Sequence, residues 1–306
     1  MSLWNFNPTI SIIVPAYNAE MFLKRALDSL SAQSFKDYEV IIIDDGSTDR
    51  TSEIASHFTS SDKRFRLLGQ ENSGVAASRQ RGLDEAKGEY TIHLDADDWM
   101  EPNMLEVLYN KARKEDADMV ICDYFEHTSA GISQVSQNLN GLDRIAIWGE
   151  MMWKKPCYLW NKLIRKRCYT EHGIRFIKGM NACEDLYAIL RILAHNIRVC
   201  FIDIPLYHYD RTQNENSLVT MIDATKRMIP MDRVAAEEDL TPVIHDFNNA
   251  VFMIAHHYLF TDKNDYINAF GKYKSTILHS QDFPLKSRLL ILSKLWGFQW
   301  IVDRFH

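Results

Sequence analysis

Four acidic side chains fall within seven residues in the stretch HLDADDWMEP, which directly follows an apolar, strand-like run. They are Asp95, Asp97, Asp98 and Glu101. Carboxylates held this close repel one another unless water, a basic side chain or a cation offsets their charge. A Mg²⁺ or Mn²⁺ ion held by one or two aspartates completes its shell with water and phosphate oxygens. The cluster therefore favours a metal–phosphate site over helix capping, which is the structural alternative for any single aspartate.

A second acidic pair, Asp44 and Asp45, ends the apolar run YEVIIIDDGS. Either aspartate could simply terminate a strand before a turn at Gly46. At the edge of a parallel sheet, however, an aspartate can accept a hydrogen bond from a nucleobase or a ribose hydroxyl. Tyr17, at the end of the run TISIIVPAY, offers a ring on which a base could stack. Together these residues predict a nucleoside slot.

Composition and charge are those of an ordinary globular chain. The 306 residues are 46% hydrophobic and 25% charged, which suits one large α/β domain with an appendage, or two domains. Subtracting 41 acidic from 35 basic residues leaves a net charge of −6, so we expect no nucleic-acid partner. Five scattered cysteines without a CxxC pair indicate a reducing compartment. The sequence shows no secretory signal and no apolar stretch of about 18 residues, so we expect a cytoplasmic protein.

Up to residue 125 the chain alternates apolar runs with helical patterns. Helices of about 10–15 residues separate the predicted strands, at 9–17, 38–47, 64–69, 89–95 and 117–125. This order predicts an α/β fold with a mostly parallel, Rossmann-like sheet covered by helices on both faces. Ligands of such sheets bind beyond the carboxyl ends of the strands. PAYN, DDGS and DADD each fall at such an end, so we expect them to converge on one rim.

Five motifs, in order, give the chain a specific resemblance. They are SIIVPAYNAE, VIIIDDGSTD, ENSGVAASRQRGL, GEYTIHLDADDWMEP and CEDLY, and they cover roughly residues 8–215. This set resembles the family 2 glycosyltransferases, which have the GT-A fold. The resemblance implies a GT-A domain over residues 1–220, with a nucleotide-sugar half at about 8–125 and an acceptor half at about 126–220. Residues 221–306 read as a helical C-terminal region.

The resemblance also implies a reaction. It is a metal-dependent, inverting transfer of a sugar from a nucleotide-diphosphate sugar, expected to be a UDP-sugar, to a glycan or lipid-linked acceptor in surface polysaccharide synthesis. Inversion needs one general base opposite the leaving diphosphate, and Mn²⁺ or Mg²⁺ would neutralise the leaving charge. The family's base is the aspartate of the Glu-Asp pair in CEDLY, which is Asp185 here. From the residues alone, Glu184 and Asp185 could equally favour a helix N-terminus.

Other family positions would bind the donor. Pro15 and Tyr17 match the motif that lines the base, and Asp45 matches the aspartate that contacts it. Arg79 matches a basic residue near the diphosphate, although it could also be a solvated helix charge. The helix reads SRQRG where the family more often has Ala-Arg-Asn, which leaves the diphosphate contacts open.

The Asp-x-Asp motif carries the remaining donor roles. In the family its first aspartate, Asp95 here, meets the ribose, and Ala96 follows it in the nucleotide-sugar site. The second, Asp97, is the metal ligand. Asp98 would either support that ligand or cap the following helix.

Several positions are weaker candidates for acceptor or secondary roles. Glu184 belongs to the Glu-Asp pair. His208 and Arg211 lie in PLYHYDRTQNENS and could contact phosphate or metal, but Asp210 stands where the family commonly has arginine. Trp160, in WNKLIRK, could form a platform for a sugar acceptor or belong to the core.

The segment at 285–306 combines apolar and basic residues. It predicts either an interfacial helix with peripheral membrane contact at the inner face of the membrane, or a helix packed on the domain. We expect the apolar face to consist of Leu285, Leu289, Leu292, Trp296 and Trp300. The basic residues Lys286, Arg288 and Lys294 lie elsewhere on the helix.

Two other functions compete with a transferase. One is a catalytically inactive module that binds a sugar or nucleotide. The other is a Mg²⁺-dependent phosphohydrolase with an aspartyl nucleophile. That chemistry requires Asp-x-Asp after the first strand, whereas the first strand here ends in VPAYN. Replacing Asp185 separates the transferase from the binding module, because only the transferase needs a base.

Overall fold

The chain forms two compact units, each described here by itself. The structure is a computed structural model that describes residues 8–153, 157–180, 182–212, 224–240, 244–259, 263–279 and 283–304. The first unit comprises the described parts of Met1–Gly141, Tyr158–Glu184 and Asn196–Asn216. The second comprises those of Leu142–Cys157, Asp185–His195 and Ser217–His306.

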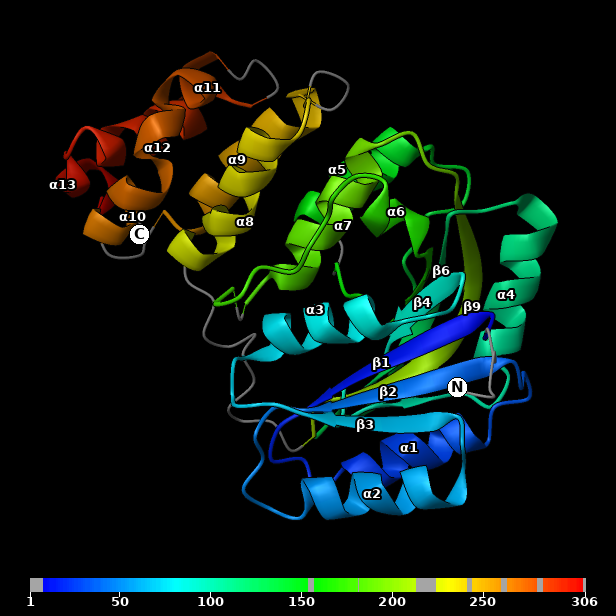
Figure 1. The fold of residues 1–306 in the computed structure, drawn as a ribbon. Helices are drawn as coiled ribbons and strands as arrows, with labels where there is room; N and C mark the ends of the chain where they lie inside the picture. Colours follow the sequence, from blue (N-terminus) through cyan, green and yellow to red (C-terminus); the bar gives the residue numbers. More distant parts are fainter. Residues whose placement is uncertain are drawn as a thin grey trace. The chain divides into compact units, whose positions relative to one another are not determined.

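A nine-stranded sheet forms the centre of the first unit. Its strands lie in the order β3-β2-β1-β4-β8-β6-β9-β5, and β7 pairs with β6 (Figure 1). The bounds are β1 Ile10–Ala16, β2 Tyr38–Asp44, β3 Phe65–Gly69, β4 Tyr90–His93, β5 Trp99–Met100, β6 Met119–Thr128, β7 Gly131–Val135, β8 Lys162–Arg165 and β9 Val199–Asp210.

The predicted parallel arrangement holds for the first four strands to appear along the chain. β1 pairs in parallel with β2 and β4, and β2 with β3. The later strands are mixed: β6 and β9 are parallel, whereas β8 is antiparallel to both β4 and β6. The short strands β5 and β7 also pair antiparallel, with β9 and β6. The parallel part therefore supplies the carboxyl-end rim that the sequence predicts.

Helices cover both faces of the parallel strands, which explains their continuous apolar sequences. All seven residues of β2 are buried. Val40 and Ile42 belong to the large core on one face, whereas Ile41 and Ile43 pack with Ala86 on the other. Figure 1 shows α1 and α2 on the first face and α3 on the second. The helices of this unit are α1 Leu23–Ser31, α2 Thr51–Ser61, α3 Val75–Glu85, α4 Met104–Glu115 and α6 Arg167–Thr170.

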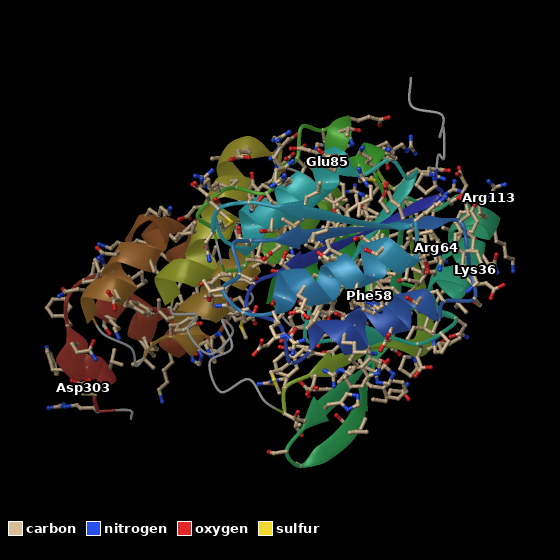
Figure 2. The ribbon with its side chains drawn as sticks, turned by 60° about the horizontal axis from the view of Figure 1, so that its bottom comes forward. Lys36, Phe58, Arg64, Glu85, Arg113 and Asp303 are labelled. Carbon is tan, nitrogen blue, oxygen red and sulfur yellow. The ribbon has the colours of Figure 1, made fainter. Side chains whose placement is uncertain are left out.

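The face that carries α1 and α2 is turned forward in Figure 2. On it, Phe58 of α2 lies with its ring centroid 5.7 Å from that of Phe65 on β3. In α1, Leu23, Ala26, Leu27 and Leu30 are buried at helical spacing, as their sequence pattern predicts. This packing fixes α1 against the sheet, which matters below because α1 also reaches the acidic rim.

The second unit is helical in its described parts. Trp148 of α5 donates a hydrogen bond to the backbone oxygen of Leu190 in α7 at 3.0 Å, and Arg191 of α7 pairs with Glu238, just after α8, at 2.5 Å. Two helices from the middle of the chain thus belong with those after residue 223, whereas the sequence suggested a linear division at 220. No described helix is long and apolar enough to span a membrane. The helices are α5 Arg144–Trp153, α7 Glu184–Ala194 (whose first residue belongs to the first unit), α8 Ala224–Glu237, α9 Ile244–His257, α10 Lys263–Phe270, the 3₁₀ turn η3 Gly271–Tyr273, α11 Lys274–His279, α12 Leu285–Leu295 and α13 Gln299–Val302.

Candidate active site

The ends of β2, β1 and β4 meet at one edge of the sheet. Because these strands are parallel neighbours, Asp45, Tyr17 and Asp95 all follow their strands at the same edge. The backbone N–H of Asp45 still donates to the oxygen of Ala16 at 2.9 Å, so the β1–β2 pairing extends up to the acidic residues. The structure therefore brings the PAYN, DDGS and DADD motifs to a common rim.

Tyr17 and Pro15 shape one side of this rim. Pairing between β1 and β4 ends at Ile13, so Pro15 lies beyond the last pair with β4 and costs that ladder no hydrogen bond. The side chain of Tyr17 is 52% exposed, which is unusual for a tyrosine directly after a buried strand. An exposed ring at this position is available for stacking with a flat ligand.

Asp45 is buried and holds the turn that precedes α3. Its Oδ1 accepts hydrogen bonds from the backbone N–H of Ser73 (2.9 Å) and from Nε2 of Gln70 (2.6 Å). Its Oδ2 accepts one from the N–H of Gly74 at 2.8 Å. Gly74 has a φ of +86°, in the region that glycine favours. A nucleobase that donated to this carboxylate would add one more hydrogen bond to these. The base contact that the resemblance implies stays a prediction.

Arg79 joins two of the predicted site motifs. Its guanidinium donates to a carboxylate oxygen of Asp95 at 2.8 Å and to the carboxylate of Glu184. The Arg79 and Glu184 side chains are only 6% and 7% exposed. Arg79 is thus no solvated helix charge. It connects α3, the first aspartate of Asp-x-Asp and the first residue of α7.

Asp98 ties the acidic loop to β9. It is fully buried, and its two oxygens accept hydrogen bonds from the Tyr207 hydroxyl and the Asp210 N–H, both at 2.8 Å. Burial, with the charges of Asp97 and Asp95, raises the pKa of Asp98 well above its usual range. Helix α4 begins only at Met104. Asp98 therefore supports the loop and does not cap that helix.

Asp97 is a second rim carboxylate whose charged form is disfavoured. Burial raises its pKa from 3.8 to about 6, and repulsion from Asp95 and Asp210 adds to this, while Arg25 opposes it. Ala96, half-buried, lies between Asp95 and Asp97 and gives the loop its Asp-x-Asp spacing. A carboxylate with a raised pKa beside other carboxylates is a group whose ionised form a cation would stabilise.

Arg25 is a rim residue that sequence reasoning missed. It lies on α1, donates to the backbone oxygen of Asp97 and pairs with Asp210 at 2.8 Å. Its guanidinium lies 3.9 Å from the centre of the Trp99 ring. In the sequence it is one basic residue of an amphipathic helix, with no motif around it. Only the placement of α1 against the sheet gives it this role.

The weaker candidates His208 and Arg211 have protein partners. Nδ1 of His208 shares a hydrogen bond with Nε2 of His127 at 2.9 Å, and its Nε2 lies 2.7 Å from Glu101 Oε1. The ring is also stacked on Trp99. Arg211 pairs with Glu126 at 3.0 Å. Contact of either residue with phosphate or metal stays a prediction.

Trp160 lies in the core of the first unit. It is 2% exposed, and its ring stacks on Tyr207, with centroids 4.2 Å apart, and on Tyr158, at 4.7 Å. In this arrangement it presents no ring face on which a sugar acceptor could pack. Of the two interpretations left open by the sequence, the structure favours the core residue.

Asp185 follows Glu184 at the start of α7, as the sequence predicts. Its Oδ1 accepts a hydrogen bond from the N–H of Leu186 at 2.8 Å. Asp185 is assigned to the second unit, whereas Glu184 belongs to the first and is held there by Arg79. The chain therefore leads from a fixed residue of the acidic site directly into Asp185.

The carboxylates at the rim fit a hard divalent cation whose remaining coordination positions would be filled by a bound ligand and water. Among the described residues, no group of three or more His, Cys, Asp or Glu side chains is arranged to hold an ion. A closed protein cage is not what Mg²⁺ or Mn²⁺ needs, because these ions keep positions for water and phosphate oxygens. Asp97, whose raised pKa a bound cation would lower, is a rim carboxylate that could take part in holding such an ion, and its role as metal ligand stays a prediction.

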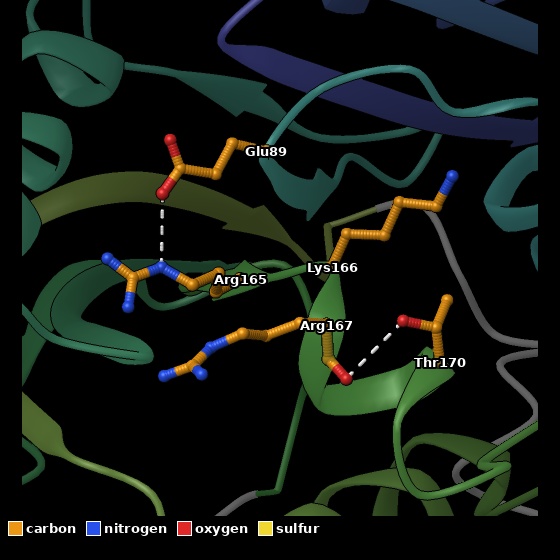
Figure 3. A pocket seen from close by; sticks show the side chains of 5 residues that line it. All are labelled: Glu89, Arg165, Lys166, Arg167 and Thr170. Carbon is orange, nitrogen blue, oxygen red and sulfur yellow. Dashed lines mark hydrogen bonds and ion pairs between the residues drawn. The ribbon is translucent and has the colours of Figure 1, made fainter.

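A cavity of about 590 Å³ lies away from these acidic residues, lined by Glu89, Arg165, Lys166, Arg167 and Thr170 (Figure 3). It adjoins the amino end of β4, where Tyr90 pairs with Arg165. Arg165 pairs with Glu89 and Asp118 at 3.1 Å, so acidic neighbours already offset its charge. The cavity is therefore not the acidic site.

The sequence pattern of the family "Glycosyl transferase family 2" matches residues 11–172, which include the β1, β2 and Asp-x-Asp motifs. The chain belongs to this family. EpsH of Bacillus subtilis is 34% identical to this family 2 chain over 211 residues, which are 66% of the chain and 60% of EpsH. The chain thus spans less than two thirds of that relative's length.

Two solved structures share the fold of this family 2 chain. TarS residues 1–349 from S. aureus, in complex with UDP-GlcNAc, matches with a TM-score of 0.73 and 19% identity, covering 97% of the chain and 92% of TarS. The mannosyltransferase PcManGT of Pyrobaculum calidifontis, in complex with GDP-Man and Mn²⁺, matches with a TM-score of 0.60 and 15% identity, covering 94% and 80%. The fold is GT-A, as the resemblance in the sequence implied.

Proposed function

We propose that this family 2 member is a metal-dependent, inverting glycosyltransferase that uses a UDP-sugar. The observation that carries the proposal is the rim on which Tyr17, Asp45 and the Asp-x-Asp loop meet at the carboxyl ends of parallel strands. Sequence motifs for a base, a ribose and a metal occur together there. The UDP-GlcNAc complex of TarS supports the choice of nucleotide.

In the proposed donor complex, the exposed ring of Tyr17 stacks on the base, beside Pro15, and Asp45 accepts a hydrogen bond from the base. Asp95 and Ala96 contact the ribose. Asp97 holds the divalent ion, Mn²⁺ or Mg²⁺, which when bound offsets the negative charge that develops on the leaving diphosphate. The Mn²⁺ complex of PcManGT supports this assignment.

Arg79 would serve the donor site through its ion pairs. Its guanidinium pairs with Asp95 and Glu184, so we propose that Arg79 orients these two carboxylates and does not bind the diphosphate directly. In water-poor surroundings, a bidentate arginine fixes carboxylate geometry better than a lysine would. Its position near the diphosphate, as the resemblance implies, is compatible with this role.

Asp185 would act as the general base. It removes the proton of the acceptor hydroxyl while that oxygen bonds to the anomeric carbon and the bond to the nucleotide diphosphate breaks, with inversion. Its chain neighbour Glu184 is held by Arg79, which limits the freedom of the backbone at this position. The acceptor would be a glycan or a lipid-linked hydroxyl of a surface polysaccharide. The five scattered cysteines, without a CxxC pair, support a cytoplasmic location.

Calorimetric titration with UDP tests the donor and metal assignments. We expect UDP to bind in the presence of Mn²⁺ and much more weakly with EDTA, and Asp97→Asn to remove the difference. A screen of nucleotide sugars for thermal stabilisation with Mn²⁺ would then identify the sugar, because a ligand of the folded state raises its stability. Equal UDP binding with Mn²⁺ and with EDTA would contradict the metal assignment.

Asp185→Asn tests the base. Loss of a general base costs about 10²–10⁴-fold in turnover, while UDP binding should be unchanged. Asp203→Asn, at an exposed aspartate on β9, is the matched control and should leave both unaffected. If Asp185→Asn retained both UDP binding and cellular function, the protein would be a binding module and not a transferase.

A further inference from the structure

The described C-terminal helices of the second unit expose a group of large apolar side chains. Half of the twelve exposed large apolar residues in the described chain fall between residues 278 and 300, each 40–58% exposed. Elsewhere such residues occur singly along the sequence, as is usual for a protein surface. We call this group the C-terminal aromatic patch; it consists of Leu278, Leu285, Leu289, Trp296, Phe298 and Trp300.

Part of the patch lies on one side of α12. Leu285 and Leu289 on that helix, and Trp296 directly after it, fall within an arc of about 40° at 100° per residue. Leu278 lies on α11, Phe298 directly precedes α13, and Trp300 lies on α13. Residues 291–295 are buried. The sequence grouped Leu292 with the apolar face of this segment and placed Lys294 elsewhere on it; both are buried, as in a helix that packs on its domain.

Lys294 shows why. Its side chain is fully buried, donates to the backbone oxygen of Leu259 at 2.6 Å and lies 4.7 Å from the centre of the Tyr266 ring. It anchors α12 to the turn that follows α9 and to α10. Next, the chain turns at Gly297, whose φ is +91°, and α13 follows. The inner side of α12 is therefore committed to the unit, while the tryptophans remain outside.

The charge around the patch is opposite to that of the whole chain. Residues 271–279 and 283–304 contain six basic side chains, of which Lys294 is buried and Lys272 pairs with Asp232 at 2.5 Å; the other four are Lys274, Lys286, Arg288 and Arg304. The acidic residues of this stretch of the sequence are Asp282 and Asp303, the latter labelled in Figure 2. The whole chain has a net charge of −6. Arg288 links α12 to α11 through the backbone oxygen of Leu278 at 2.8 Å, and Arg304 lies 5.3 Å from the centre of the Trp300 ring. Apolar and cationic groups thus occur together in the segment that runs from α11 to the end of α13.

We propose that the C-terminal aromatic patch docks onto an anionic lipid surface. Tryptophan and phenylalanine with adjacent lysine and arginine are the composition that binds in the headgroup region of a bilayer. A second copy of the chain fits less well, because a symmetric contact would bring two positively charged patches together. This inference does not depend on the transferase proposal.

Vesicle cosedimentation tests the proposal with the full chain and no nucleotide. The wild type should bind vesicles of phosphatidylglycerol and phosphatidylcholine, and bind less at high salt or to phosphatidylcholine alone. Each basic residue near an anionic surface contributes about fivefold, so Lys286→Gln with Arg304→Gln should weaken binding about 30-fold. Trp296→Gln with Trp300→Gln removes the exposed aromatic area and should weaken it by at least roughly tenfold.

Matched controls lie in the first unit. Met21→Gln with Ile132→Gln removes exposed apolar groups, and Lys87→Gln with Lys114→Gln removes exposed charges. Both should bind vesicles as the wild type does. Thermal unfolding checks that each variant folds, and quenching of wild-type tryptophan fluorescence by brominated lipid gives a readout that needs no substitution.

Three results would overturn the proposal. The first is that the wild type neither binds anionic vesicles nor shows quenching by brominated lipid. The second is that both patch variants bind vesicles as well as the wild type does. The third is that a patch variant changes the mass of the protein in solution in the absence of lipid. The last result would show that the patch contacts protein.

Discussion

Replacing Arg79 by methionine tests whether the acidic site is held together by a buried ion-pair network. Methionine keeps most of the aliphatic volume and removes the guanidinium. Asp95 and Glu184 then lose the charge that both contact in the structure. If this network fixes the Asp-x-Asp loop and the start of α7, stability and ligand binding should both fall.

The expected loss of stability follows from burial. Removing one partner of a buried ion pair typically costs about 3–5 kcal/mol, because the other charge stays buried and unpaired. Glu184 is 7% exposed and should contribute nearly in full, whereas Asp95 is 29% exposed and is partly solvated. We therefore expect a loss of about 3–4 kcal/mol, which lowers Tm by roughly 10 °C in a protein of this size.

Arg81→Met is the matched control on the same helix. Arg81 donates to the backbone oxygen of Gly69 at 2.6 Å and lies near the surface, so its loss should cost about 1 kcal/mol. In a double-mutant cycle, Arg79→Met combined with Glu184→Gln should cost less than the sum of the single changes, with a coupling of about 1–3 kcal/mol. Equal Tm shifts for the two arginine variants, or no coupling to Glu184, would refute the network.

Two further predictions concern the rim. Tyr17→Ala should weaken UDP binding by roughly tenfold, because stacking of a base on an aromatic ring contributes about 1–3 kcal/mol, while Tyr17→Phe should bind normally. The pKa of Asp97, about 6, exceeds the ordinary 3.8, so between these pH values the folded metal-free protein binds more protons than the unfolded chain and its stability falls as pH rises. Asp97→Asn in EDTA should therefore be more stable than the wild type above about pH 6, by up to about 3 kcal/mol, and should lose Mn²⁺-dependent UDP binding. Urea unfolding at acidic and neutral pH measures this, and an unchanged or lowered stability at neutral pH would contradict it.

The sequence predicted those parts of the fold whose signal is local. β1, β2 and β3 coincide with the predicted segments to within a few residues, because apolar runs specify them. β5 has two residues and β8 has four, too few for a periodic pattern, and neither was predicted. Both pair antiparallel with their neighbours, so the mixed pairing in the second half of the sheet could not be predicted from the sequence either.

Within the site, residue types could be predicted but partners could not. Asp45 was expected at the rim, yet its hydrogen bonds go to Ser73 and Gly74, whose approach depends on the turn before α3. Arg25 had no motif, because a single arginine on an amphipathic helix is an ordinary solvated charge until α1 is packed. Lys294 is a buried charge: the sequence placed it away from the apolar face of its segment, and only the packing of α12 buries it.

The acidic loop is contacted by arginines from helices on opposite faces of the sheet, and this bears on why Asp97 is the metal candidate. Arg79, on α3, pairs with Asp95, and Arg25, on α1, pairs with Asp210. Asp98 is satisfied by two hydrogen-bond donors of β9. Arg25 reaches Asp97 through the backbone oxygen of that residue. Burial and repulsion from Asp95 and Asp210 raise the pKa of the Asp97 carboxylate to about 6. A cation binding there would relieve an unfavourable charge already present in the folded protein, so the same residue should cost stability without metal and provide affinity with it.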